Sequence, residues 1–198
     1  MKITSLKQQV KNPQRVSVFV DEKYSFSLSL DELVKHKVKQ GDELNEADVK
    51  KFKKISDDGK LTARVLAWVL NRPHSERELR DYLRRKKVEP ELIKKLVEEF
   101  MAKKYLDDEA YGRWLIELRG RGGKSDRALR AELFAKGLDG EVISNILEEQ
   151  EASEVERLRL LIAKKRALSR YKNDQLKLIK YLTSQGFPYD LVKQELNT

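Results

Sequence analysis

Ser75-Glu-Arg-Glu-Leu-Arg-Asp-Tyr-Leu83 and Ser125-Asp-Arg-Ala-Leu-Arg-Ala-Glu-Leu133 are two copies of one pattern, set 50 residues apart. Each copy begins with a serine that can cap a helix, and its two leucines follow at a spacing that puts them on one helical face. The pattern returns from Asp174, with Leu178 and Leu182 in the same register. A capping residue and two leucines that keep their register three times predict a protein built from helical repeats.

Three helices are expected in each copy. The capped helix should end at Gly137 in the second copy and at Gly186 in the third, because glycine adopts the left-handed conformation without strain, whereas the first copy has Lys87 there. The first helices are predicted at 59–71, 108–120 and 153–170, and the third helices at 90–104, 140–151 and 189–197. Since one such unit cannot bury its apolar side chains alone, neighbouring repeats should stack into an elongated array.

The N-terminal part of the chain follows a different pattern. Residues 15–20 alternate and are rich in β-branched valine, and residues 24–28 alternate again, so the two segments predict a β-hairpin; residues 3–10 are a candidate third strand. Helices should begin after Ser29 and after Asn45, and Asp57-Asp58-Gly59 is the expected joint. We therefore predict a mainly α protein with a small α+β N-terminal unit at 1–57 and three-helix repeats at 58–107, 108–151 and 152–198.

Composition excludes several classes of protein. The chain has 198 residues, a formal charge of +9 and a pI near 9.5, which favours a polyanionic partner. Because it has no cysteine, it forms no disulfide, thiolate zinc site or cysteine nucleophile. No stretch approaches the roughly 18 apolar residues of a membrane span, and residues 1–9 lack the apolar core of a signal peptide. We expect a cytoplasmic monomer that contacts no membrane and needs no cofactor.

Basic residues are segregated within the repeats. Residues 72–87 and 113–136 each carry seven basic and three acidic side chains, and residues 157–180 carry nine and one. By contrast, residues 138–156 hold seven acidic residues and no basic one. If the repeats stack in register, the basic segments form one surface. The alternative is a solvated face with intrahelical ion pairs, such as Glu76 with Arg80.

The candidate binding residues are arginines and lysines of these segments, because their side chains suit phosphate and carboxylate oxygens. Arg77 and Arg80 match Arg127 and Arg130 of the second copy, beside the leucine face. The full predicted set is Arg72, Arg77, Arg80, Arg84, Arg113, Arg119, Arg121, Lys124, Arg127, Arg130, Lys136, Lys164, Lys165, Arg166 and Arg170. Four nearby aromatic residues are more typical of a core than of a base-stacking surface: Trp68, Tyr82, Tyr111 and Trp114.

The sequence indicates no catalytic or metal chemistry. Gly123-Lys124-Ser125 resembles the end of a phosphate-binding P-loop, but Leu118 stands where the first glycine is required, and a helix is expected before the loop instead of a strand. Asp107-Asp108-Glu109 is better explained as the acidic start of a helix than as a metal site. His36 and His74 lie far apart in the sequence, and His74 is expected in an exposed loop.

Three segments carry a resemblance to a known family: Arg72-Pro-His-Ser-Glu-Arg-Glu-Leu79, Tyr105-Leu-Asp-Asp-Glu-Ala-Tyr-Gly-Arg-Trp114 and Leu129-Arg-Ala-Glu-Leu-Phe-Ala-Lys-Gly-Leu138. Over about residues 59–198 the chain resembles the RecX family, bacterial regulators of the RecA recombinase in DNA repair. Its N-terminal extension looks like that of relatives from some Gram-positive lineages. The resemblance implies a protein that lies in the groove of the RecA–single-stranded-DNA filament. There it would modulate filament growth, strand exchange, ATP hydrolysis and co-protease activity, usually by inhibition.

Three hypotheses about function remain open at this point. The first is a regulatory protein that binds the RecA–single-stranded-DNA filament and inhibits the recombinase. The second is a direct DNA-binding protein that acts through a basic helical-repeat surface. The third is an enzyme that uses the Gly120–Lys124 loop on nucleotides, which the missing glycine disfavours. Binding to single-stranded DNA, measured with and without the recombinase, separates the first two.

Overall fold

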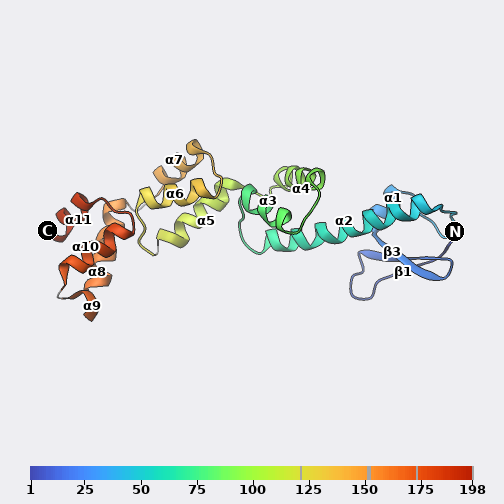
Figure 1. Cartoon of the computed structure of the whole chain (residues 1–198), viewed down its shortest axis with the longest axis horizontal. Coiled ribbons are helices and arrows are strands. Elements are labelled where there is room, and N and C mark those ends of the chain that lie inside the picture. Colours follow the sequence, from blue (N-terminus) through green and yellow to red (C-terminus); the bar gives the residue numbers. More distant parts are fainter. Residues whose placement is uncertain (121, 151–152, 173, 198) are drawn as a thin grey trace. The chain divides into compact units, whose positions relative to one another are not determined.

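The computed structural model describes residues 1–120, 122–150, 153–172 and 174–197. It divides into two compact units, Met1–Trp68 and Val69–Thr198. The described chain is mainly helical, with one antiparallel sheet near the N-terminus (Figure 1). This confirms the predicted mainly α fold with a β-containing N-terminal unit.

The N-terminal unit contains a three-stranded sheet, and apolar side chains from two helices pack against it. Its strands β1 (Ile3–Gln8), β2 (Arg15–Val20) and β3 (Lys23–Ser29) pair in that order, each antiparallel to the next. The candidate third strand is therefore confirmed. Alternation along β2 and β3 places apolar side chains in a core, and α1 (Leu30–Lys35) then begins with a capping box between Ser29 and Glu32.

The predicted joint at Asp57-Asp58-Gly59 is wrong, because one helix, α2 (Glu46–Leu70), runs through it. Gly59 does not make a turn. A Cβ there would lie 2.5 Å from Oε1 of Glu32 and 3.3 Å from Nη1 of Arg15, so the glycine permits close packing of α2 on the rest of the unit. Buried Arg15 adds a polar link, since it donates to the carbonyl oxygens of Ser27 and Ser56. The remaining domain boundaries stay a prediction.

The repeats contain the predicted helices. In the first repeat, α2 is followed by α3 (Glu76–Arg85) and α4 (Pro90–Ala102). The second repeat consists of α5 (Asp108–Gly120), α6 (Asp126–Ala135) and α7 (Gly140–Glu148). The third repeat contains α8 (Glu154–Arg166), α9 (Ser169–Lys172), α10 (Gln175–Ser184) and α11 (Tyr189–Asn197). The helix expected at 153–170 is thus two helices, and Tyr171 of α9 is buried in the core of the third repeat.

The three aligned helices bury the predicted leucines. Leu79 and Leu83 of α3 and Leu133 of α6 are fully buried, and Leu178 and Leu182 of α10 are at most 1% exposed. Ser75, Ser125 and Asp174 each accept a hydrogen bond from a backbone N–H in the first turn, as predicted. The same register therefore gives both the helix starts and the apolar cores.

The start of the first capped helix meets the end of the second, and the start of the second meets the end of the third. Oγ of Ser75 donates to the carbonyl oxygen of Lys136 at 2.9 Å, and the N–H of Ser125 donates to the carbonyl oxygen of Gln185 at 3.1 Å. An acidic side chain from the next repeat binds the same helix start. The carboxylate of Asp108 accepts from the backbone N–H of Glu76 at 2.8 Å. In the same way, the carboxylate of Glu154 accepts from the backbone N–H of Asp126 at 2.9 Å. These contacts join consecutive repeats and satisfy helix-start amides.

Gly137 and Gly186 are required at these junctions for two reasons. Both have left-handed backbones, with φ of +90° and +98°. A Cβ at Gly137 would lie 2.8 Å from that of Arg77, and a Cβ at Gly186 would overlap Oγ of Ser125. Lys87, at the same place in the first copy, also has a positive φ of 56°, but no copy of the pattern precedes it.

Leu133→Ala should destabilise the protein by about 2–5 kcal/mol, because it leaves a cavity in a fully buried site. The measurement is the free energy of unfolding from denaturant titration. Leu118→Ala is the matched control, since Leu118 is 47% exposed and should change stability by less than about 0.5 kcal/mol. Equal midpoints for parent and Leu133→Ala would refute the assigned core face.

Gly186→Ala should cost about 1–3 kcal/mol more than Gly41→Ala, because it adds a steric overlap at the junction. Gly41 has nearly the same φ, +95°, but a Cβ there meets nothing within 4 Å, so the pair separates overlap from backbone strain. Thermal or denaturant unfolding of both variants measures the difference. Equal losses of stability would mean that the junction does not need the glycine.

Candidate functional site

Several predicted binding residues hold the first and second repeats together. The carboxylate of Glu78, 15% exposed, is bound by Arg72 at 3.0 Å and Lys136 at 2.9 Å. Tyr111 donates its hydroxyl to the same carboxylate at 3.3 Å, and Nδ1 of His74 lies 3.1 Å away. Glu78 of α3 therefore joins α5, the residue that follows α6 and the loop before α3, and Arg72 and Lys136 form ion pairs in this junction.

The electrostatics of this cluster keep Glu78 ionised. Burial alone would raise its pKa, but the hydrogen bonds from Lys136 and Arg72 outweigh that effect and the net pKa is lowered. Burial raises the pKa of the Tyr111 hydroxyl, and the neighbouring Glu78 charge raises it further. The cluster is thus a carboxylate anchored by two cations and a neutral phenol, and nothing in this arrangement provides a nucleophile.

Other predicted residues form ion pairs within or between neighbouring helices. Glu132 of α6 binds Arg119 and Lys124, each at 2.8 Å, and these hydrogen bonds lower its pKa against the raising effect of burial. The remaining pairs are Arg80 with Glu76, Arg84 with Asp81, and Arg113 with both Glu109 and Glu149. The ion pairs expected for a solvated face are therefore present at these residues, and their charge is balanced locally.

Three predicted arginines of the first two repeats lack such balance. Among the described residues, none of the carboxylates forms an ion pair with Arg77, Arg127 or Arg130. Arg130 donates to the hydroxyl of Ser144, a neutral group. Arg127 and Arg130 are exposed on α6, and the stem of Arg77 on α3 lies against Gly137, just beyond the end of α6. We call Arg77, Arg127 and Arg130 the basic face.

The basic face does not extend to the equivalent helix of the third repeat. Leu176 and Ile179 of α10 stand where α6 has Arg127 and Arg130. The predicted binding residues of the third repeat lie on α8 and α9 instead, and they pair with none of the described carboxylates: Lys164, Lys165, Arg166 and Arg170. The ammonium group of Lys165 lies 4.4 Å from the ring centre of Tyr181. The continuous surface expected from in-register stacking is therefore interrupted.

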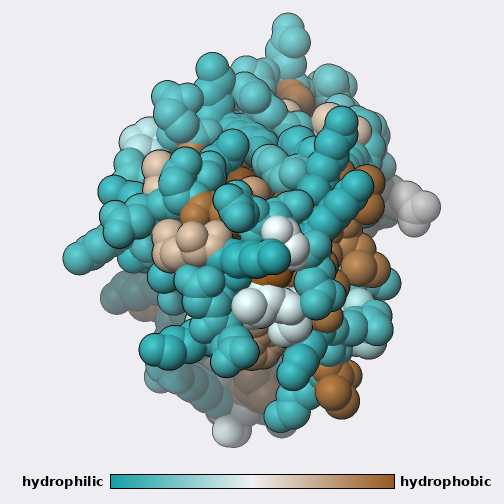
Figure 2. All heavy atoms as spheres, turned by 90° about the vertical axis from the view of Figure 1, so that its right-hand side faces the viewer, coloured by the Kyte–Doolittle hydropathy of each residue, from teal (hydrophilic) through white to brown (hydrophobic). Residues whose placement is uncertain are grey.

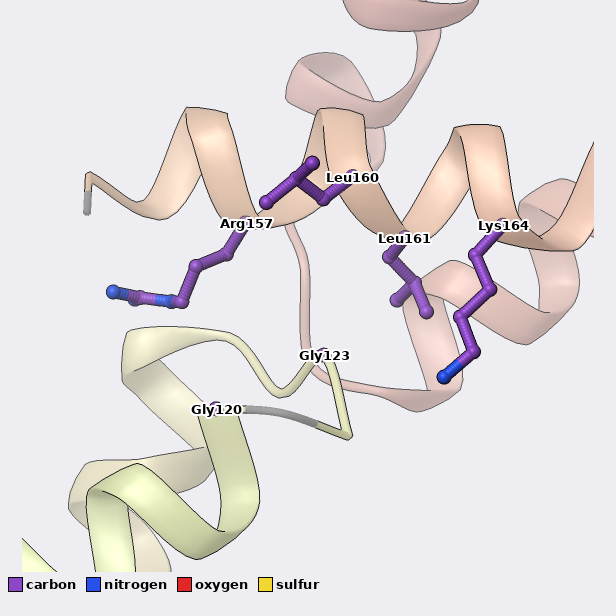
Figure 3. Close-up of a pocket in the computed structure, with 6 residues that line it drawn as sticks. All are labelled: Gly120, Gly123, Arg157, Leu160, Leu161 and Lys164. Carbon is purple, nitrogen blue, oxygen red and sulfur yellow. The ribbon is translucent and has the colours of Figure 1, made fainter.

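A cleft of about 150 Å³ lies between α8 and the turn that joins α5 to α6. Arg157, Leu161 and Lys164 project from α8 towards Gly120 and Gly123 (Figure 3). Arg157 forms an ion pair with Asp126, whereas Lys164 has none with the described carboxylates. Leu161 occupies the space beside Gly123, where a Cβ would lie 2.6 Å from its methyl carbon. The glycine-rich turn is thus explained by packing of the second repeat on the third.

Some predictions about single residues need correction. His74 is 2% exposed instead of lying in an exposed loop, because it packs beside Glu78. Tyr111 is buried and Trp114 packs against the same core, as predicted, while Trp68 and Tyr82 are partly exposed. Predicted residue Arg121 lies outside the described residues.

Two features of the structure were not predicted from the sequence. Glu78 is joined to Lys136 across 58 residues, a pairing that local spacing does not indicate. Phe134 is 68% exposed, although the sequence did carry a signal, since Phe134 aligns with the outward-facing Arg84 of the first copy.

Other kinds of site find no support in the described residues. They contain no group of three or more histidine or acidic side chains placed to hold a metal ion. Within the same ranges, no helix has the length and apolarity needed to cross a membrane. Asp107 accepts from the N–H of Ala110, which confirms it as a helix start. The face seen in Figure 2 is mainly hydrophilic, with only small hydrophobic patches.

Comparison with known proteins identifies the family. Residues 1–45 match the regulatory protein RecX N-terminal domain, 64–100 the first three-helix domain of RecX, and 107–147 its second three-helix domain. A regulatory protein RecX of Listeria monocytogenes is 33% identical over 98% of this chain and 74% of its own length. The chain belongs to the RecX family. A RecX protein of Bacillus licheniformis is 31% identical, over 98% of the chain and 76% of the relative.

Solved RecX structures share the fold. One crystal structure of a regulatory protein RecX has a TM-score of 0.77 at 20% identity and covers 100% of this chain and 99% of its own. RecX from Lactobacillus salivarius has a TM-score of 0.56 at 20% identity, over 71% of this chain and 95% of its own. Membership of the RecX family, and not the likeness of fold, makes the chain a regulatory protein and not an enzyme, as the sequence predicted.

Glu78→Gln should destabilise the protein by about 1–3 kcal/mol at pH 7, because it removes the anion that two cations share. The pKa of Glu78 is lowered by folding, so its stabilising effect is complete above the ordinary value of 4.5 and is lost as the pH falls through the folded value. Unfolding measured from pH 7 down to pH 3 should show the two proteins converging. Glu99→Gln, at a surface pair, is the control. A constant difference across this range would contradict the assignment.

Proposed function

We propose that this RecX-family chain regulates the RecA recombinase by binding the RecA–single-stranded-DNA filament through the basic face, Arg77, Arg127 and Arg130. The observation that carries the proposal is the lack of described carboxylate partners for these arginines in the first two repeats, where the other described predicted residues are all ion-paired. An exposed guanidinium that is not neutralised internally attracts phosphate or carboxylate groups of a partner.

The family supports the partner, and the repeat junctions support the geometry. The matched relatives are named as regulatory proteins RecX, and the resemblance noted above implies RecA as their target. The Ser75–Lys136 contact brings α3 to the end of α6, so Arg77 and the α6 arginines belong to neighbouring parts of one surface. A filament presents phosphates and protein at regular intervals, which suits a binding surface shared by two repeats.

The double variant Arg127→Ala/Arg130→Ala should keep its stability within about 0.5 kcal/mol for each exposed site. It should lose most of the parent's effect on ATP hydrolysis by RecA on single-stranded DNA. If the two side chains contact phosphates, the salt dependence of binding should weaken by about 0.7 in log–log slope for each lost contact. Steady-state hydrolysis and binding titrations at several salt concentrations measure these effects.

Lys60→Ala/Lys103→Ala is the matched control, because it removes the same net charge from exposed lysines that form ion pairs with Asp57 and Glu99. This variant should regulate RecA as the parent does. If Arg127→Ala/Arg130→Ala also regulates RecA at the parental concentration, the basic face is only solvated and the proposal fails. Equal binding of the parent to bare single-stranded DNA and to the filament would favour direct DNA binding over recombinase regulation.

A further inference from the structure

The outer face of α6 carries an aromatic ring among the unbalanced arginines. Phe134 is 68% exposed, which makes it the most exposed aromatic side chain in the described part of the protein. Arg127, Arg130 and Ala131 precede it by seven, four and three residues, so all four lie on one side of the helix. Each of them is exposed. The ring therefore adjoins a small alanine and follows Arg130 by one turn.

The acidic residues of α6 do not neutralise this face. The helix contains two of them, Asp126 and Glu132. Asp126 forms an ion pair with Arg157 of α8, and Glu132 binds Arg119 and Lys124. The positive charge around Phe134 is therefore left for an external anion.

The face has cations beyond both ends of the ring. Arg127 lies about 10 Å from Phe134 along the helix axis. At the other end, the side chain of Arg77 lies over Gly137, three residues beyond Phe134. Among the described residues Phe134 makes no ring–ring or cation–ring contact, so its face is open to a ligand. A flat aromatic surface flanked by guanidinium groups is the arrangement that binds single-stranded nucleic acid.

We infer that Phe134 stacks on an unpaired base of single-stranded DNA while Arg127, Arg130 and Arg77 bind the adjacent phosphates. This rests on the proposed function and assigns the DNA contact within it. One ring among arginines and alanine provides a platform for a single base, whereas a protein interface of ordinary size needs a larger apolar centre. Stacking does not require a particular base, so the contact should be insensitive to sequence.

The test compares two oligonucleotides that differ only in their bases. The full chain is titrated, without RecA, with a fluorescent oligo-dT and with an abasic oligonucleotide of equal length and charge. The parent should bind the base-containing strand more tightly, and Phe134→Ala should weaken that binding by about 5-fold or more while its affinity for the abasic strand stays unchanged. Phe134→Tyr should retain the preference, and Phe134→Leu, which keeps an apolar side chain but no ring, should lose it.

Leu176→Ala is the control variant, because Leu176 is 73% exposed on α10, the equivalent helix of the third repeat. This variant should bind both strands as the parent does. Circular dichroism should show every variant folded, since these side chains are largely exposed. If Phe134→Ala binds both strands with parental affinity, or if Phe134→Leu equals Phe134→Tyr, the stacking inference is overturned. Loss of RecA binding in the absence of DNA would instead assign Phe134 to the protein partner and also overturn it.

These results are distinguishable from failure of the proposed function. In a parallel assay, each variant is tested for its effect on ATP hydrolysis by RecA on single-stranded DNA. If the parent and Phe134→Ala regulate RecA equally while the oligonucleotide preference is absent, only the stacking inference fails. If the parent itself has no effect on RecA, the proposed function fails, whatever the oligonucleotides show.

Discussion

The contact between one capped helix and the end of the next is the constraint on which the repeat structure depends. Ser75 and Ser125 each cap their own helix and also bind the turn that ends the following capped helix. That second role requires a turn without a side chain, which Gly137 and Gly186 provide. Helix capping, helix termination and repeat stacking are thus one local arrangement, used twice along the chain.

The junctions between repeats also engage several of the basic residues in ion pairs. Glu78 forms ion pairs with Arg72 and Lys136 where the first and second repeats meet, and Asp126 forms an ion pair with Arg157 where the second repeat meets the third. What remains without a described carboxylate partner is a smaller group of cations than the sequence suggests. Our proposal therefore rests on the distribution of ion pairs and not on the total charge.

The repeat register was predictable because it depends on local rules: a capping residue, two leucines one turn apart and a terminal glycine. The same rules failed at Gly59, where a glycine after two aspartates resembles a turn but allows α2 to pack close to Glu32 and Arg15. These rules also could not show that Arg80 forms an ion pair with Glu76, as the alternative interpretation proposed, whereas Arg130 forms none with the described carboxylates. Pairings such as Glu78 with Lys136 depend on stacking between repeats, which periodicity within one helix does not specify.

In the proposed complex, the basic face contacts the filament and the ion-paired arginines do not. Chemical modification of arginine side chains, followed by mass spectrometry of the chain alone and bound to the RecA–single-stranded-DNA filament, tests it most directly. We expect strong protection of Arg77, Arg127 and Arg130 on binding, with Arg84 and Arg113 reacting equally in both states. Unchanged reactivity of Arg127 and Arg130 in the bound state, with protection of Arg84 or Arg113 instead, would contradict it.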